Sequence, residues 1–310
     1  MFYAGIYLGG AEAVVRFPYS VGIVAFMIYP SLLKSDEGAS RLVRRLIDDP
    51  FFDLLELPPI GVSEWQGISE AASKSGRRVS FALGMQPEIL VRGLNPSSTR
   101  EEERKEAEER LVALTGEACS RGYTGVALCS GPNVPESDKD RALESFKKTV
   151  SAIAEKAGEC GIPVYIETFD TDVDKKRLVG RLELAARLVD ELRSSYSNVY
   201  ILWDLSHAPL LGEKPEDLKG YADLIGHIHI GAAKMVEGKL YDYHPGFHRP
   251  GAVNDERDVA SLLSVLDDVS YRGAVSFEVK PEEGQLSEEV IASSKSVLVR
   301  AFQLFLEGRV

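Results

Sequence analysis

The chain has 310 residues, of which 44% are hydrophobic and 27% are charged, which is the composition of an ordinary globular protein. This composition excludes a disordered chain, a collagen-like repeat and a disulfide scaffold, and the length is enough to bury a large core. The 48 acidic residues outnumber the 36 basic ones, and the net charge is −12. Because this charge disfavours binding to a phosphate backbone or to anionic lipid, we expect neither nucleic acid nor a membrane as a partner.

Eight short apolar segments recur along the chain from residue 20 onward. They are rich in Val, Ile, Leu, Phe and Tyr and mostly lack alternation with polar residues, which is typical of strands that are covered on both faces in a parallel sheet. The predicted strands lie within residues 20–30, 51–59, 78–86, 125–131, 164–170, 199–206, 224–232 and 274–281.

Amphipathic patterns lie between these segments. Apolar residues at spacings of three and four, with charged residues on the opposite face, predict helices. One of them opens with hydroxyl residues and acids and ends near Gly122, as a capped helix does. The clearest helices are predicted at 97–122, 143–157, 178–192 and 287–307.

The regular alternation of strand and helix predicts one α/β domain over residues 1–310, a single (β/α)8 barrel. The alternative is a doubly wound open sheet, which would carry a glycine-rich phosphate-binding turn after its first strand. No G-x-G-x-x-G pattern follows residues 20–30, so the barrel is favoured. Residues 1–18 fit no strand–helix unit, and we interpret them as a hairpin that caps the floor of the barrel.

The three cysteines, Cys119, Cys129 and Cys160, form no C-x-x-C pair and lie in segments that look like core. We predict that all three are reduced, buried thiols. The N-terminal segment lacks a basic region and contains Glu12 and Arg16, unlike a secretory signal. No stretch reaches the ~18 uncharged apolar residues of a membrane span, so we expect a cytoplasmic protein. The sequence leaves a monomer and a homo-oligomer equally open.

All five histidines fall between His207 and His248, at or after the ends of the sixth and seventh predicted strands. In a (β/α)8 barrel, the carboxyl ends of the strands form the active-site face. Histidines that were scattered for structural reasons would not cluster in this way. The clustering therefore predicts a functional site at that face.

Carboxylates join the histidines at matching positions. Glu167, Asp204, His229 and Glu278 lie near the ends of predicted strands five, six, seven and eight. Because an ionised carboxylate in the helix layer would be badly desolvated, we expect these side chains to point to the mouth of the barrel. Each taken alone can be half of a buried ion pair. Together they form an oxygen-rich set that suits a divalent ion, with Mn²⁺ first and Mg²⁺, Co²⁺ or Zn²⁺ as alternatives.

These motifs together resemble the xylose isomerase-like TIM-barrel superfamily, which includes sugar isomerases, ketose 3-epimerases, inosose dehydratases and nucleases of the endonuclease IV type. The likeness runs from about residue 20 onward and is carried mainly by the second half of the chain. The residues that carry it are Glu167, Asp204-x-x-His207, His229, Tyr271-x-Gly273 and Glu278. The resemblance implies that Glu167, Asp204, His229 and Glu278 hold the metal, that both glutamates are catalytic acid/base groups, and that His207 contacts substrate.

A metal-dependent sugar or sugar phosphate isomerase or epimerase is the function that this predicts. A metal-bound carbonyl acidifies the neighbouring C–H bond, and two glutamates from different strands can remove and return the proton. The alternatives are a dehydratase of a cyclic polyol, an endonuclease IV-like nuclease and a sugar-binding barrel without catalysis. A nuclease of that type needs two further histidines, which the third and fourth predicted strands lack.

Other residues near the predicted mouth are candidates for binding a small carbohydrate. Lys234 stands near the place of an arginine that ketose epimerases carry, and Lys280 should face the same side as Glu278. An acid that epimerases place after the first metal glutamate has no single match. The substrate-binding candidates are His207, Lys234, His244, His248, Arg249 and Lys280. In enzymes of the endonuclease IV type, an Asp-x-His pair and the histidine of the D-x-x-H motif hold an additional zinc, so the resemblance leaves a second metal open at His207, Asp242 and His244. Further pocket candidates are Glu56, Gln86, Asn133 and Trp203.

Overall fold

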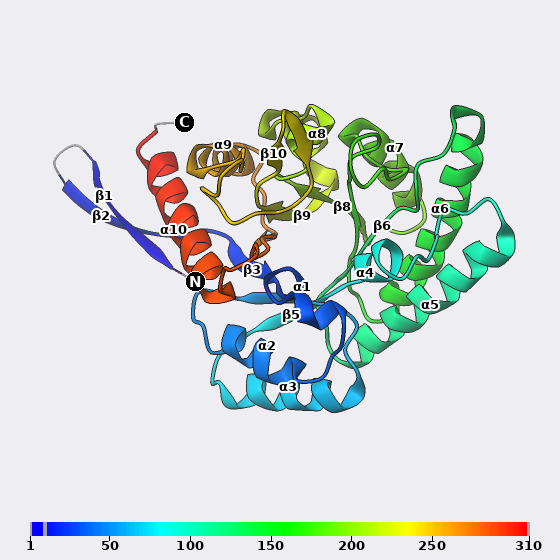
Figure 1. Cartoon of the computed structure of the whole chain (residues 1–310), viewed down its shortest axis with the longest axis horizontal. Helices are drawn as coiled ribbons and strands as arrows, with labels where there is room; N and C mark the ends of the chain where they lie inside the picture. Colours follow the sequence, from blue (N-terminus) through cyan, green and yellow to red (C-terminus); the bar gives the residue numbers. More distant parts are fainter. Residues whose placement is uncertain (1, 9–10, 309–310) are drawn as a thin grey trace.

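The computed structural model describes residues 2–8 and 11–308 and shows the predicted (β/α)8 barrel. Eight parallel strands close into a barrel in the order β12-β3-β4-β5-β6-β7-β8-β9, and helices surround them (Figure 1). The strands are β3 (Ser20–Val24), β4 (Leu54–Leu57), β5 (Ser80–Gly84), β6 (Val126–Cys129), β7 (Val164–Glu167), β8 (Val199–Asp204), β9 (Ile225–Ile230) and β12 (Ala274–Phe277). Each of them lies inside its predicted segment.

Helices follow the strands as the amphipathic patterns indicate. The α-helices are α1 (Ala25–Ile28), α2 (Ala39–Ile47), α3 (Val62–Lys74), α4 (Gln86–Leu90), α5 (Glu101–Ser120), α6 (Glu136–Gly158), α7 (Leu182–Arg193), α8 (Ala208–Leu211), α9 (Glu256–Asp268) and α10 (Ser287–Leu306). Two 3₁₀-helices, η1 (Pro30–Leu33) and η2 (Pro215–Leu224), and a small hairpin of β10 (Lys234–Val236) and β11 (Lys239–Tyr241) complete the loops. Among the described residues, no helix has the length and apolar character needed to cross a bilayer.

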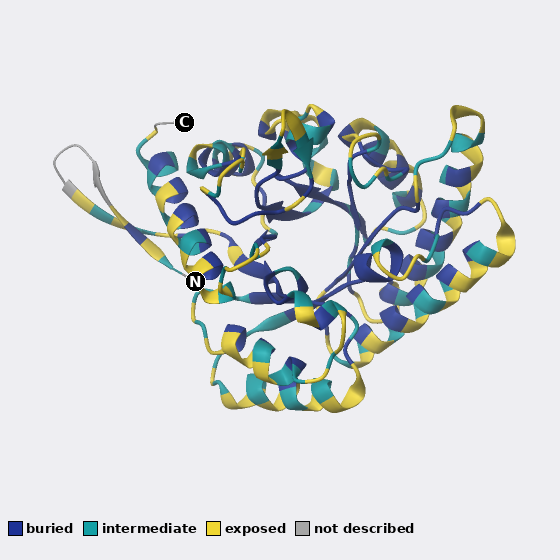
Figure 2. Cartoon of the chain, in the orientation of Figure 1, coloured by how far each residue is buried: buried dark blue, intermediate teal, exposed yellow. Residues whose placement is uncertain are grey.

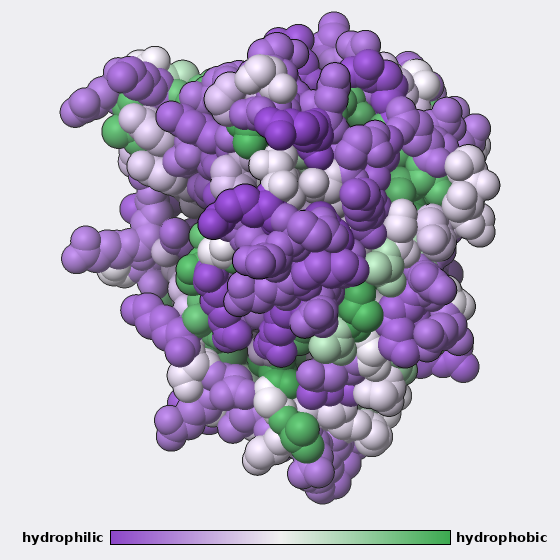
Figure 3. All heavy atoms as spheres, turned by 90° about the vertical axis from the view of Figure 1, so that its right-hand side faces the viewer, coloured by the Kyte–Doolittle hydropathy of each residue, from purple (hydrophilic) through white to green (hydrophobic). Residues whose placement is uncertain are grey.

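The core lies in two layers, inside the barrel and between the barrel and its helices. Leu55, Ile166 and Phe277 from three different strands are completely buried. The helices bury the side that faces the barrel and expose the other, as Figure 2 shows. The outer face that carries α5 and α6 is mainly hydrophilic, with small separate groups of hydrophobic atoms (Figure 3). This burial on both faces is the reason that the strands appear in the sequence as continuous apolar runs.

The N-terminal segment forms an antiparallel hairpin of β1 (Tyr3–Leu8) and β2 (Ala11–Arg16). At its base, Phe2 stacks on Phe17 with ring centroids 4.7 Å apart, and Phe17 meets Phe302 of α10 edge to face. The rest of the hairpin extends outward beside α10 (Figure 1). Residues 1, 9 and 10 of the predicted cap lie outside the described residues. A role of this hairpin as a cap of the barrel floor stays a prediction.

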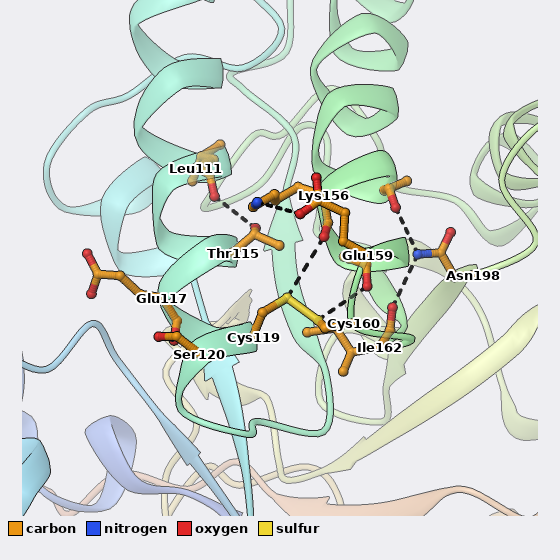
Figure 4. The surroundings of a disulfide bond; sticks show 12 residues. Leu111, Thr115, Glu117, Cys119, Ser120, Lys156, Glu159, Cys160, Ile162 and Asn198 are labelled. Carbon is orange, nitrogen blue, oxygen red and sulfur yellow. Dashed lines mark hydrogen bonds and ion pairs between the residues drawn. A yellow bond between two sulfur atoms is a disulfide. The ribbon is translucent and has the colours of Figure 1, made fainter.

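The prediction that all three cysteines are reduced is wrong. Cys119, at the end of α5, and Cys160, just after α6, form a disulfide, and Cys129 is the free buried thiol (Figure 4). The two bonded cysteines are 41 positions apart in sequence, yet the side-by-side packing of the parallel helices α5 and α6, which brings their C-terminal ends together, places their Cα atoms at 5.8 Å. A search for closely spaced cysteine pairs cannot find such a contact, because it depends on helix packing.

We expect reduction of the Cys119–Cys160 disulfide to destabilise the fold. Closing a loop of this length restricts the unfolded chain, and its loss should cost about 4 kcal/mol of unfolding free energy. Thermal melting with and without a strong reductant measures this, and the double variant C119S/C160S should melt like the reduced protein. Thiol labelling under denaturing conditions should modify only Cys129 before reduction. Labelling of all three cysteines in the unreduced protein would contradict the bond.

Candidate metal centre

The structure brings the four predicted metal ligands together at the carboxyl ends of the strands. Glu167 ends β7, Asp204 ends β8, His229 is the penultimate residue of β9, and Glu278 directly follows β12. All four are buried. One ligand atom from each lies within 4.8 Å of the corresponding atoms of the other three. Neighbouring strands thus deliver one side chain each to a common point.

Backbone packing sets the position of Glu278. Its N–H donates to the carbonyl oxygen of Ile230 over 2.9 Å, which continues the pairing of β12 with β9. A Cβ atom on Gly231 would lie only 2.4 Å from the carbonyl oxygen of Glu278. Glycine at this position therefore permits the close approach that places Glu278 beside His229.

Hydrogen bonds orient the side chains of the cluster. Nδ1 of His229 lies 2.8 Å from Oε2 of Glu278 and 3.6 Å from Oε1 of Glu167. Nε2 of Gln86, at the start of α4, donates to Oε2 of Glu167 over 2.7 Å. On the opposite side of the ring, Nε2 of His229 meets Oε2 of Glu56 at 3.0 Å. The cluster therefore has supporting contacts on both sides.

The residues present fit a divalent cation. Oε1 of Glu167 is buried and has no hydrogen-bond partner among the described residues. Buried polar atoms are normally hydrogen-bonded, so an unpaired carboxylate oxygen directed at three other potential ligands requires an explanation. A cation that these atoms share provides it, and three carboxylates with one imidazole are a suitable donor set.

Burial or neighbouring charges raise the pKa values of two members of the cluster. Burial raises the pKa of Glu278 to about 7, and the nearby Glu167 adds to this against the opposing effects of His244 and His229. Burial disfavours charge on His229, but Glu56 and Glu278 outweigh it and raise the pKa of His229 well above its usual value. A cation at this point would therefore compete with protons for Glu278 and His229.

The second predicted set, His207, Asp242 and His244, also comes together, directly beside the first. Nδ1 of His207 lies 2.7 Å from the carbonyl oxygen of Thr168, and this turns Nε2 toward Oδ1 of Asp242 at 3.2 Å. Nε2 of His244 lies 2.5 Å from the same Oδ1 atom. Burial opposes charge on His244, but Asp242 outweighs it and raises the pKa of His244 to about 9. Asp204, His207, His244 and Glu278 form a second group with ligand atoms within 4.8 Å.

A cavity of about 310 Å³ opens onto these two groups. Glu167, Glu278, Asp242 and His244 line it, together with Lys280. The apolar part of its lining comes mainly from the loops and short helices after β3 and β5. The apolar residues of the lining are Phe26, Met27, Pro30, Leu33, Pro87, Leu90, Val91 and Phe169. The cavity thus combines acidic and apolar lining residues.

Two cations in this cavity escaped the sequence analysis. Lys175 and Arg177 line it from the loop after β7. Asp170 ties this loop by accepting the backbone N–H of Lys175 over 2.6 Å, and Nζ of Lys175 then reaches Oδ2 of Asp242 at 3.3 Å. Irregular loops have no periodicity that reveals which side chains turn inward. The only signal is that loops at the carboxyl ends of the strands form the active-site face.

Three predicted substrate ligands lie elsewhere in the described structure. Lys234 forms an ion pair with Glu282, and Nε of Arg249 donates to the same carboxylate over 2.8 Å. His248 is exposed, and its Nε2 lies 3.0 Å from Oε2 of Glu256. None of these three lines the cavity described above. That these three residues bind substrate stays a prediction. That the substrate is a small carbohydrate also stays a prediction.

Of the four further pocket candidates, two lie at the site and two do not. Gln86 lines the cavity, and Glu56 contacts His229 from inside the barrel. In contrast, Nε1 of Trp203 donates to Glu213, and the amide of Asn133 donates to the carbonyl oxygen of Thr171. Trp203 points away from the mouth because alternate residues of β8 face opposite sides, and Asp204 takes the inward position.

Comparisons with known proteins agree with the architecture. The family model for the xylose isomerase-like TIM barrel matches residues 46–296. A search of the curated proteins finds no match. A D-tagatose 3-epimerase-like protein of known structure superposes with a TM-score of 0.69 at 20% identity, covering 94% of this chain and 100% of that chain.

Two further structures of similar fold carry other descriptions. The IOLI protein with a binding zinc atom has a TM-score of 0.71 at 17% identity, covering 92% of this chain and 99% of its own. An AP endonuclease of family 2 from Brucella melitensis has a TM-score of 0.64 at 19% identity, covering 90% of this chain and 99% of its own. At these identities the likeness shows the fold alone. The family model spans most of the chain, and on this ground the chain belongs to the xylose isomerase-like TIM-barrel family.

Proposed function

We propose that this protein is an enzyme, a divalent-metal-dependent isomerase or epimerase of a sugar or sugar phosphate. The observation that carries the proposal is the convergence of Glu167, Asp204, His229 and Glu278 at one point of a cavity. Two of these four, Glu167 and Glu278, line the cavity itself. A site of this kind combines metal ligands with groups that can transfer protons.

The metal would be held by the four converging residues. A divalent ion bound there supplies Lewis-acid polarisation of a substrate carbonyl, which raises the acidity of the adjacent C–H bond. The oxygen-rich donor set favours Mn²⁺, and the zinc atom in the structure of the IOLI protein supports Zn²⁺ as the next choice. His207, Asp242 and His244 would form a second cation site beside it.

The two glutamates would do the proton transfer. Glu167 comes from β7 and Glu278 from the end of β12, so they approach the centre from different sides of the barrel. One carboxylate removes the proton next to the carbonyl, and the other returns a proton. Gln86 holds Oε2 of Glu167 by a hydrogen bond, which leaves Oε1 directed toward the cluster. A site with proton-transfer groups on two sides suits epimerisation as well as isomerisation.

Positive side chains in the cavity favour a substrate with an anionic group. Arg177 and Lys280 line the cavity and form no ion pair among the described residues, whereas Lys175 is paired with Asp242. Nε of Arg177 is buried and has no acceptor in the described part of the chain. Arginine binds phosphate and carboxylate groups well. Phosphorylated ketoses are therefore expected to react faster than the free sugars.

Deuterium exchange tests the proposal directly. The Mn²⁺-loaded protein is incubated in D₂O with a panel of free and phosphorylated ketoses, and ¹H NMR follows the proton next to the carbonyl. We expect exchange with at least one ketose, followed by a product with inverted configuration or a shifted carbonyl group. A product that has lost water would instead indicate a dehydratase. Absence of exchange across the panel, with folded and metal-loaded protein, would overturn the proposal.

A further inference from the structure

A buried carboxylate inside the barrel, Glu56, contacts His229 of the candidate metal centre. Glu56 lies in β4, and only 3% of its surface is exposed. Its Oε1 meets Nε2 of His227 at 2.9 Å, and its Oε2 meets Nε2 of His229 at 3.0 Å. With His227 and His229 it forms a separate group whose ligand atoms lie within 4.8 Å of one another, but it does not belong to the group of four converging ligands that includes His229. Glu56 therefore acts on that group only through His229.

The two nitrogens of His229 face different neighbours. Nδ1 faces Glu278 and Glu167, and Nε2 faces Glu56. An ionised carboxylate only accepts hydrogen bonds, so the contact with Glu56 places a hydrogen on Nε2. In the neutral ring, Nδ1 then carries the lone pair and points it at the cluster. Metal-binding histidines in proteins are commonly held by a carboxylate on the opposite nitrogen.

His227 holds Glu56 itself in place. It lies two residues before His229 on the same face of β9, and the two rings are 5.1 Å apart at 83° to each other. Each ring therefore takes one oxygen of the carboxylate, which fixes both its position and its rotation. With one imidazole nitrogen against each of its oxygens, Glu56 is placed to accept a hydrogen bond from both rings.

We propose that Glu56 is a positioning residue of the metal centre: it holds His229 in the tautomer and orientation that present Nδ1 to the ion, and His227 holds Glu56. The inference rests on the proposed function, because it concerns the same metal centre. It adds a carboxylate that neither binds the metal nor contacts substrate. Its effect should appear in metal affinity and in the geometry at the metal.

The test compares Glu56→Gln with a matched control, Glu213→Gln. Glu213 is also a carboxylate that accepts two N–H groups, from Leu182 and Trp203, but it lies outside the described metal groups. Mn²⁺ titration by calorimetry gives the dissociation constant, and the visible spectrum of the Co²⁺-loaded protein reports the ligand geometry. We expect Glu56→Gln to weaken Mn²⁺ binding about 10- to 100-fold and to change the spectrum. The control should stay within about threefold of the wild type on the same scale.

A second variant separates positioning from charge. Glu56→Asp keeps the negative charge but is too short to serve both His227 and His229, so positioning predicts weakened binding here too. It also serves if Glu56→Gln does not fold. Wild-type affinity and an unchanged Co²⁺ spectrum in the folded Glu56→Asp protein would overturn the inference, even if its melting temperature falls. Failure of the wild type to bind any metal would instead overturn the proposed function and the positioning role together.

Discussion

Replacing Glu278 by glutamine should lower the rate of deuterium exchange about 10³-fold, within the range that general acid–base groups contribute. The amide cannot accept a proton from carbon, and it is a poorer metal ligand than the carboxylate. Glu167→Gln should have a similar effect, because each glutamate is proposed to serve one direction of proton transfer. Exchange is measured with the best ketose of the panel, and bound Mn²⁺ is measured in the same samples.

The control for this experiment is Glu288→Gln. Glu288 is an exposed acid at the start of α10, where it pairs with Arg45, and it does not line the cavity. It should leave exchange unchanged. The amount of bound Mn²⁺ distinguishes the two possible causes of a loss of deuterium exchange. Loss of exchange in a variant that still binds the metal supports the acid/base role. Exchange that survives in either Glu167→Gln or Glu278→Gln would show that the assignment of that glutamate is wrong.

Mn²⁺ affinity should rise steeply with pH. In the metal-free site, burial and the nearby Glu167 hold the pKa of Glu278 at about 7 despite His244 and His229. Below that pH, Glu278 is protonated, and the proton must leave before the carboxylate can bind a cation. His229 must likewise lose a proton, because its pKa is raised well above the usual value. Protons thus compete with the metal at two of its four proposed ligands.

Each proton that is released on binding contributes up to about a tenfold change in apparent affinity per pH unit. We therefore expect the dissociation constant for Mn²⁺ to fall from pH 6 to pH 8 by at least about tenfold, which is the share of Glu278, and by up to roughly 1,000-fold with the proton of His229 included. Calorimetry in two buffers with different ionisation enthalpies measures the proton release directly. A dissociation constant that is independent of pH across this range, or one that rises, would contradict the proton-coupled site.

The barrel and the four converging residues could be predicted from sequence because both depend on strong local patterns. Strands that are buried on both faces appear as apolar runs, and polar residues such as Glu167 and Asp204 stand out at the ends of these runs. Once the barrel is predicted, its geometry places all strand ends at one face. The register of β8 with β9 then brings Asp204 opposite His229.

Other features depend on tertiary contacts that have no local pattern. The Cys119–Cys160 bond requires the packing of α5 against α6, and the sequence analysis predicted free thiols there. Arg177 reaches the cavity through the path of an irregular loop. Lys234, which was expected to bind substrate, pairs instead with Glu282 from the loop after β12. Glu56 looked like a pocket residue, but its orientation toward His229 depends on the inner face of the closed barrel.

The most direct test of the account is the metal content of the purified protein. After loading with Mn²⁺ or Zn²⁺ and removal of the free ion, elemental analysis should find at least one tightly bound divalent ion per chain, and the melting temperature should rise because the ion binds only the folded state. His229→Ala should lose that ion. A wild-type protein that retains no ion and melts at the same temperature with and without metal would contradict the central claim.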